Sequence, residues 1–229
     1  PEEQQTLQQW ISAGAPWGKH WAFEPPTKSE IPISGSHPID YFVQQRLGLE
    51  GWTLAEEAPR HTLLRRLSFD LTGLPPSHEE VQDFERDPSP DAHLRQVERL
   101  LRSPHHGERM AMWWLDAARY ADTDGYQGDA TRANWPWRDW VVQAFNENMP
   151  FDQFTLEQFA GDLLPDATPE QILATSFHRN HMTNGEGGRD PEESRIDYVI
   201  DRVNTVGTIW MGMTVGCAQC HSHKFDPLS

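Results

Sequence analysis

The feature that most constrains this chain is a short segment near its end, Cys217-Ala218-Gln219-Cys220-His221, which holds both of its cysteines. Two cysteines separated by two residues and followed at once by a histidine form the attachment pattern of a c-type haem. At this spacing both thiols lie on one helical turn and add to the two vinyl groups of the haem, while the histidine ligates the iron. We therefore expect one covalently attached haem c, held by Cys217, Cys220 and His221.

Three other interpretations of the same residues stay open. Cys217 and Cys220 would suit a redox-active dithiol, but no β-α-β pattern surrounds them. They would supply half of a zinc site if His221 and His223 completed the set, although four ligands within seven residues strain tetrahedral geometry. They would also suit a structural disulfide.

Composition narrows the class of protein and the kinds of partner. The 229 residues are 37% hydrophobic and 10% aromatic, with ten tryptophans, which favours a folded core over disorder. The formal net charge of -16 repels nucleic acid and anionic lipid, so we expect neither as a partner; it suits a basic redox partner or a cation. No run of eighteen apolar residues is present, so we expect no transmembrane segment.

Helical periodicity and capping residues run through the chain, whereas strand patterns are nearly absent. We therefore expect a mainly α fold, an irregular multi-helix domain with long loops around the haem. Ser77 with Glu80 has the pattern of a capping box, and Pro169 suits the first turn of a helix. The expected helices cover residues 2–13, a segment from 38 onwards, 58–71, 77–86, 91–102, 105–120, 138–148, 151–160, 168–177 and 191–207.

Apolar spacing also predicts which faces of these helices are buried. We expect Leu94, Val97 and Leu101 to face inward and Arg60 to face outward. The apolar face of the helix over 191–207 is expected to consist of Ile196, Val199, Ile200 and Val203.

Several longer segments share a pattern with one family. Residues 65–76 read RRLSFDLTGLPP, residues 114–122 read WLDAARYAD, and the haem motif lies within GCAQCHSHKFDP at 216–227. In these segments the chain resembles the planctomycete-type cytochrome c-associated proteins, in particular planctomycete cytochrome domain 2, a domain of unknown function. The other matching segments are 20–23 with 25–26, 138–141, 160–165, 177–180 and 201–205.

The resemblance implies a domain organisation and a compartment. Residues 1–19 resemble the C-terminal helix of a preceding cytochrome c-like module, and 20–38 would be a linker rich in Pro, Gly and Ser. Residues 39–229 would be the helical haem c-binding domain, truncated at its C-terminal end. Family members are secreted to the periplasm or cell surface, so we expect an export signal in a longer precursor. One departure is Ser222, where members usually carry aspartate.

A c-type haem has either a sixth ligand or an open distal face. The candidate ligands are His178, His181, His223, Met182, Met211 and Met213. His178 is favoured because it directly follows an expected helix, which holds it more firmly than His181 in the middle of the next loop. We therefore expect His221 and His178 as the iron ligands, with Met182 or an open face as the alternatives.

Haem propionates are negatively charged and bind Arg, Lys or Trp N–H donors. We expect Arg119, Arg202 and Lys224 to contact them, with Arg179 as a further candidate. For each, the alternative is a surface ion pair.

Aromatic and acidic residues gather in the middle of the chain. The tryptophans at 113, 114, 135, 137 and 140 would form core, a wall beside the haem or a platform that stacks on sugars. Asp122, Asp124 and Asp129 around Gly125 resemble a weak calcium loop without its final glutamate. A second acidic set consists of Glu186, Asp190, Glu192 and Glu193. For both sets the alternative is a solvated loop without a specific role. Either set could also supply a proton donor if the distal face of the haem is open.

Three functions follow from these features. The first is a c-type haem protein that transfers electrons within a larger periplasmic protein, with a redox partner or an adjacent cytochrome c module. The second is a haem-dependent enzyme acting on a polysaccharide-derived or peroxide substrate. The third is a glycan-binding module with a structural metal at the Cys/His cluster. The motif favours the first, although the chain is longer than an electron carrier requires.

Overall fold

The computed structural model describes residues 2–16, 18, 21–29, 31, 37–126, 128–225 and 228. It divides the chain into two compact units, Pro1–Glu57 and Ala58–Ser229. Within the described residues the structure has ten α-helices and four 3₁₀ helices, and its one pair of bridged residues is Thr123 with Thr131. The expected mainly α class is confirmed. The domain boundaries expected at 19/20 and 38/39 stay predictions.

The first unit contains helices that bury none of their residues. These are α1 (Glu2–Ser12), the 3₁₀ helix η1 (Trp21–Phe23) and α2 (Pro38–Leu49). His37 caps α2, because its Nδ1 accepts a hydrogen bond of 3.3 Å from the backbone N–H of Ile39. Much of the expected linker, including residues 32–36, lies outside the described residues.

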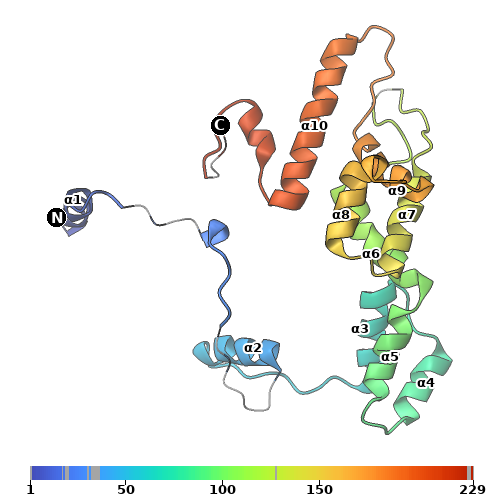
Figure 1. The fold of residues 1–229 in the computed structure, drawn as a ribbon. Helices are drawn as coiled ribbons and strands as arrows, with labels where there is room; N and C mark the ends of the chain where they lie inside the picture. Colours follow the sequence, from blue (N-terminus) through green and yellow to red (C-terminus); the bar gives the residue numbers. More distant parts are fainter. Residues whose placement is uncertain are drawn as a thin grey trace. The chain divides into compact units, whose positions relative to one another are not determined.

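The second unit is a chain of helices that pack on their neighbours. Its α-helices are α3 (Arg60–Thr72), α4 (His78–Arg86), α5 (Ala92–Leu101), α6 (Pro104–Ala117), α7 (Trp135–Asn146), α8 (Phe151–Ala160), α9 (Pro169–Ala174) and α10 (Pro191–Met211) (Figure 1). Its 3₁₀ helices are η2 (Gly161–Leu163), η3 (Thr175–Arg179) and η4 (Val215–Gln219). Helix α3 contacts α4, α5 and α6, and α6 packs along α7.

The main core gathers aromatic side chains from α6 to α10. Trp137 is fully buried and donates from Nε1 to the carbonyl of Ala174 at 3.1 Å. Phe154 packs edge-on against Trp114, with ring centroids 4.8 Å apart. The core interpretation is confirmed for Trp114, Trp137 and Trp140, whereas Trp113 and Trp135 are exposed.

A smaller core, built on Leu64, Phe84 and Ala92, corrects one expectation. Arg60 does not face outward. Its guanidinium lies 4.0 Å from the centre of the Phe84 ring and donates to the carbonyls of Phe84 and Asp87. Because these carbonyls lie at the C-terminal end of α4, the cation fits the negative end of the helix dipole.

The buried face of α5 is also not the expected one. Leu94 is 57% exposed and Leu101 is 44% exposed, whereas Ala92 and Leu100 are buried. Helix α5 packs against α3, where Ala92 joins Leu64 in the smaller core. At about 100° per residue, positions 94 and 101 lie on the other side of the helix from positions 92 and 100. Val97, also expected to face inward, is half-buried.

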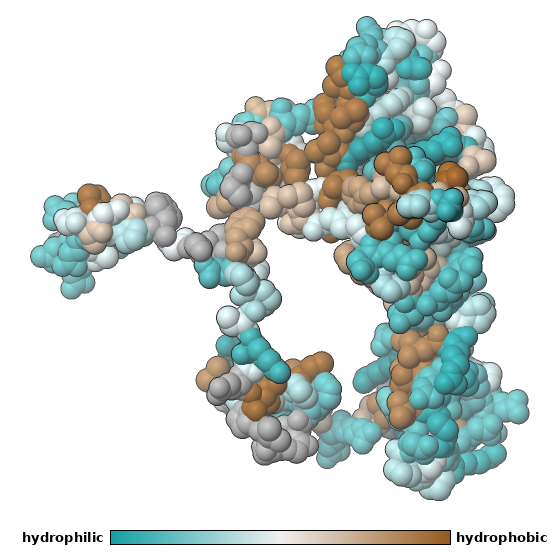
Figure 2. Space-filling model, in the orientation of Figure 1, coloured by the Kyte–Doolittle hydropathy of each residue, from teal (hydrophilic) through white to brown (hydrophobic). Residues whose placement is uncertain are grey.

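Helix α10 is longer than expected and presents an apolar face to solvent. It continues to Met211, four residues past the expected end, and Gly212 ends it in a left-handed conformation with φ 62°. Ile196, Val199 and Val203 are each more than 40% exposed. Figure 2 shows an apolar strip along this helix.

Candidate functional site

The Cys217–His221 motif lies on an exposed turn that follows α10; this turn is called the haem turn below, because haem is the cofactor expected there. Cys217 belongs to η4, and Cys220 is the residue that caps it. Because a 3₁₀ helix has three residues per turn, residues three apart lie on the same side. Both cysteines are free thiols and both are exposed. The three-residue spacing therefore favours both thiols on one side of the turn, which suits two-point attachment to a cofactor.

The histidines of the motif have different surroundings. Nδ1 of His221 lies 2.9 Å from the carbonyl oxygen of Ser222, which leaves Nε2 available for a metal. Nδ1 of His223 accepts a hydrogen bond from the backbone N–H of Phe225 at 3.2 Å. Among the described residues, no three His, Cys, Asp or Glu side chains are grouped so that they could hold one metal ion.

An apolar cavity of about 510 Å³ lies beside this turn. Helix α10 supplies most of its wall, η3 supplies His178 and η4 supplies Val215. This volume is within the usual range for cofactor pockets. The residues that line the cavity are His178, Val199, Arg202, Val203, Val206, Gly207, Met211, Val215 and Leu228.

Gly207 lets η4 lie against α10. A Cβ atom at this position would overlap the side chain of Val215, two residues before Cys217. Sequence reasoning missed both residues. The available signal was a glycine inside a helical pattern, which often marks a close approach of another segment.

We expect Gly207→Ala to displace the haem turn and to destabilise the second unit by about 1–3 kcal/mol through overpacking. Urea denaturation measures the loss. Val215→Ala in the same chain should restore much of it, because it removes the overlapping methyl groups. Gly48→Ala, at a helical glycine of α2 with no atom near the new Cβ, is the control and should be neutral or slightly stabilising. A Gly207→Ala variant as stable as the control would contradict this account of the contact.

His178 is held at the cavity by aromatic side chains. Its ring meets those of Phe159 and Phe177 edge-on, with centroids 5.4 Å and 5.2 Å apart. Burial lowers the pKa of His178, and the neighbouring Arg202 lowers it further. A neutral imidazole is the form that ligates metals. No side-chain or backbone group among the described residues bonds to the ring nitrogens of His178.

The other candidate ligands lie elsewhere, apart from Met211, which lines the cavity. Nδ1 of His181 lies 2.8 Å from the carbonyl oxygen of Met182, and its Nε2 lies 2.9 Å from Nη2 of Arg202. The side chain of Met182 is 54% exposed and lies beside Gly125. The backbone N–H of Met213 bonds to Gly207.

Of the three arginines and one lysine expected at the propionates, only Arg202 lies at the apolar cavity. Arg202 lines the apolar cavity, and its Nε donates to the carbonyl of His178 at 2.9 Å. Arg119 instead forms an ion pair with Asp201 and bonds to Thr205, which joins the end of α6 to α10. Lys224 is exposed, with Nζ 5.1 Å from the centre of the Phe225 ring. Arg179 is exposed and lines a second cavity.

Each acidic set forms hydrogen bonds within its own loop or helix end. Asp122 accepts from the hydroxyl of Tyr120, and burial together with this contact raises the pKa of Tyr120 to about 12. Hydrogen bonds from Thr123 and Gly125 lower the pKa of Asp129. Asp190 caps α10 by accepting from two backbone N–H groups. Calcium binding stays a prediction.

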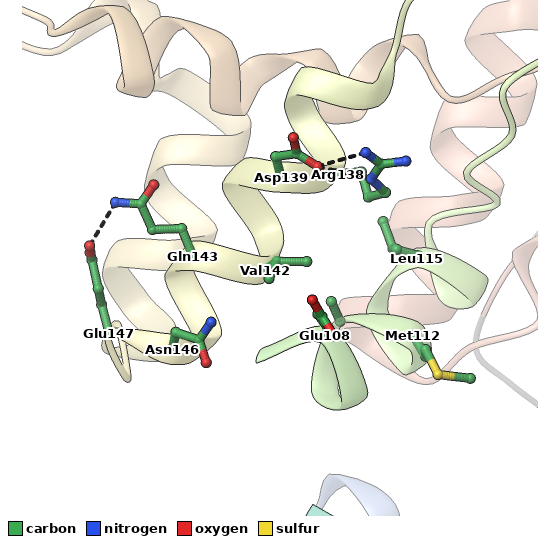
Figure 3. Close-up of a pocket in the computed structure, with 10 residues that line it drawn as sticks. Glu108, Met112, Leu115, Arg138, Asp139, Val142, Gln143, Asn146 and Glu147 are labelled. Carbon is green, nitrogen blue, oxygen red and sulfur yellow. Dashed lines mark hydrogen bonds and ion pairs between the residues drawn. The ribbon is translucent and has the colours of Figure 1, made fainter. Parts of the chain in front are cut away.

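A larger cavity, of about 700 Å³, lies between α6 and α7 and away from the haem turn (Figure 3). Four of its polar side chains bond to one another in pairs. Arg138 pairs with Asp139 at 2.8 Å, and Gln143 donates to Glu147 at 2.7 Å. The smaller apolar cavity is the better candidate site, because Val215 of the haem turn lines it and the two exposed thiols follow on the same turn.

Comparison with known proteins gives one match. A family described as "PSCyt2: Protein of unknown function (DUF1549)" matches residues 38–229, a span that contains α2, the whole second unit and the haem motif. No curated protein and no solved structure matches the chain. In the described part of the chain, no helix is both long and apolar enough to cross a membrane.

Proposed function

This chain belongs to the PSCyt2 family of proteins of unknown function, and from that premise we propose that it is a c-type haem protein of the electron-transfer class. Cys217 and Cys220 would attach the haem, and His221 would ligate its iron. The observation that carries the proposal is the apolar cavity that adjoins the exposed pair of thiols.

The residues around this cavity suit a haem. The cofactor is a large apolar ring with two carboxylates at one edge, so it needs an apolar wall and a nearby cation. Val199, Val203 and Val206 supply the wall, and Arg202 supplies the cation. Burial of these valines beneath an apolar ligand contributes roughly 25 cal/mol for each Å² removed from water. When bound, haem supplies a one-electron iron couple whose potential the protein sets through ligands and burial.

Covalent attachment is the direct test. Protein made with a cytochrome c maturation system should gain the mass of one haem and keep its colour after acid–acetone extraction. The double variant Cys217→Ala/Cys220→Ala should lose covalent haem completely, whereas Ser222→Ala should retain it. A colourless wild-type protein that contains zinc would refute the proposal.

The compartment and partners follow from the same chemistry. Thioether bonds form outside the cytoplasm from reduced thiols, which supports a periplasmic or cell-surface location. We also infer that residues 1–19 are the tail of an adjacent cytochrome c module, the nearest source of electrons; α1 is consistent with this. A full-length gene without an export signal would count against both inferences.

A carbohydrate-directed function is the second candidate. Trp113 is 65% exposed and lines a further cavity of about 460 Å³ with Met112, Asp116 and Tyr120. An exposed tryptophan beside a carboxylate is the usual composition of a sugar-stacking site. Arg109 lies 5.4 Å from the centre of the Trp113 ring and so competes for that surface. Glycan binding that Trp113→Ala abolishes would favour this function.

A further inference from the structure

Arginine side chains from three segments meet at a second, polar cavity of about 310 Å³. Arg132 comes from the loop between α6 and α7, Arg179 from the end of η3 and Arg202 from α10. We infer that this cavity is a binding site for a small oxyanion, a carboxylate or phosphate group.

The charge balance of the cavity is the first argument. The chain carries 35 acidic residues against 19 lysines and arginines, so each cation has many carboxylates available. Yet none of these three arginines forms an ion pair with a carboxylate in the described part of the chain. Of the described residues, Asp124 is the one acid that lines the cavity, which leaves an excess of two positive charges among them. In an otherwise acidic protein, such an excess attracts an anion.

Two of the arginines are held in place by uncharged groups. Arg132 donates to the carbonyls of Ala121, Arg179, Asn180 and His181 at 2.7–3.2 Å. Arg202 donates to the carbonyl of His178. Hydrogen bonds to carbonyls fix the position of a guanidinium but leave its net charge unbalanced. A preorganised cation of this kind binds an anion without losing further side-chain entropy.

Unused hydrogen-bond donors are the second argument. Within the described residues, neither the Arg179 guanidinium nor Nη1 of Arg202 has a partner. An oxyanion accepts hydrogen bonds and donates none, so it is the ligand that such a surplus of donors fits.

The surroundings of His181 agree with an excess of positive charge in the cavity. Burial lowers the pKa of His181, and Arg202 and Arg132 lower it further, as a positive field requires. The ring is stacked on Tyr198 with centroids 4.4 Å apart. It therefore stays neutral near pH 7 and leaves the charge of the site to the arginines.

Two sources would supply an oxyanion to this cavity: a haem propionate and a free small anion. Arg202 lines both this cavity and the apolar one, so a haem propionate would reach the arginines from the haem site. A free small anion, such as a phosphate or a carboxylate of a substrate, would enter from solvent. The first source rests on the proposed function, and the second does not.

Isothermal titration with inorganic phosphate tests the site. The haem-free variant Cys217→Ala/Cys220→Ala is compared with the haem-loaded protein, at constant ionic strength. We expect saturable binding to the haem-free protein in the millimolar range or tighter. Loss of this binding in the haem-loaded protein would identify a propionate as the occupant, and unchanged binding would identify a free anion.

Arg179→Gln is the informative variant, because Arg179 is exposed and no structural contact depends on its side chain. We expect it to weaken phosphate binding about tenfold, as the loss of one charged hydrogen bond does. The matched control is Arg189→Gln, which removes the same charge from the loop that follows η3, outside the cavity. Phosphate binding that is absent in the haem-free protein, or that both variants change equally, would overturn the inference. Neither result depends on whether the protein takes up haem.

Discussion

Trp137→Ala is expected to lower the free energy of unfolding by about 3–5 kcal/mol, the usual cost of removing a large buried aromatic side chain. Trp137 has no exposed surface and lies at the centre of the main core. Its ring stacks with Tyr120 and contacts Phe177, with centroids 6.1 Å and 6.2 Å away. The substitution also leaves the Ala174 carbonyl without its donor. Urea denaturation followed by far-ultraviolet circular dichroism measures the change.

Trp135→Ala is the matched control, because Trp135 lies two residues earlier in the same helix and is 52% exposed. We expect it to cost less than about 1 kcal/mol, as for most exposed positions. A typical domain is stable by only about 5–15 kcal/mol, so Trp137→Ala should remove a large share of the stability while the control stays close to the wild type. Equal losses in the two variants would mean that the core is not centred on Trp137.

His178→Ala is expected to change the haem-loaded protein from low-spin to high-spin iron and to speed the binding of carbon monoxide. The reason is that His178 lines the apolar cavity and carries a neutral ring with no hydrogen-bond partner in the described structure. Optical spectra of the oxidised, reduced and carbon monoxide-bound protein report the coordination of the iron.

His181→Ala is the control for this prediction. His181 lines the polar cavity, where Arg202 and Met182 hold its ring, so its loss should leave the spin state unchanged. A wild-type protein that is already high-spin would show an open distal face. That result would favour a haem-dependent enzyme over an electron carrier.

Local signals explain why most helices could be predicted. The capping box of Ser77 with Glu80 is present in the structure, and α8 spans the expected residues 151–160. Thr168 and Gln171 form a second capping box at the start of α9. In each capping box the side chains that bond to the backbone lie within one helical turn of the helix start. The start of such a helix can therefore be predicted without any tertiary contact.

Features that depend on packing could not be predicted in this way. Periodicity identified an apolar face on α5, but the contact with α3 selected Ala92 and Leu100 instead of the leucines at 94 and 101. The motif predicts attachment residues, but it does not predict the apolar cavity, which brings together His178 and Val215, 37 residues apart in the chain. Arg132 carried no local signal at all, because its partners are carbonyls about fifty residues later.

The exposed position of the thiols has a consequence for the order of assembly. The buried members of the main core lie between Ala111 and Phe177, so none of them belongs to the haem turn. The buried core would therefore not need the haem turn in order to form. Under the proposed function, η4 would stay accessible and the cofactor would be added to a scaffold that is already folded. Protein made without haem should then be folded and colourless, as circular dichroism would show.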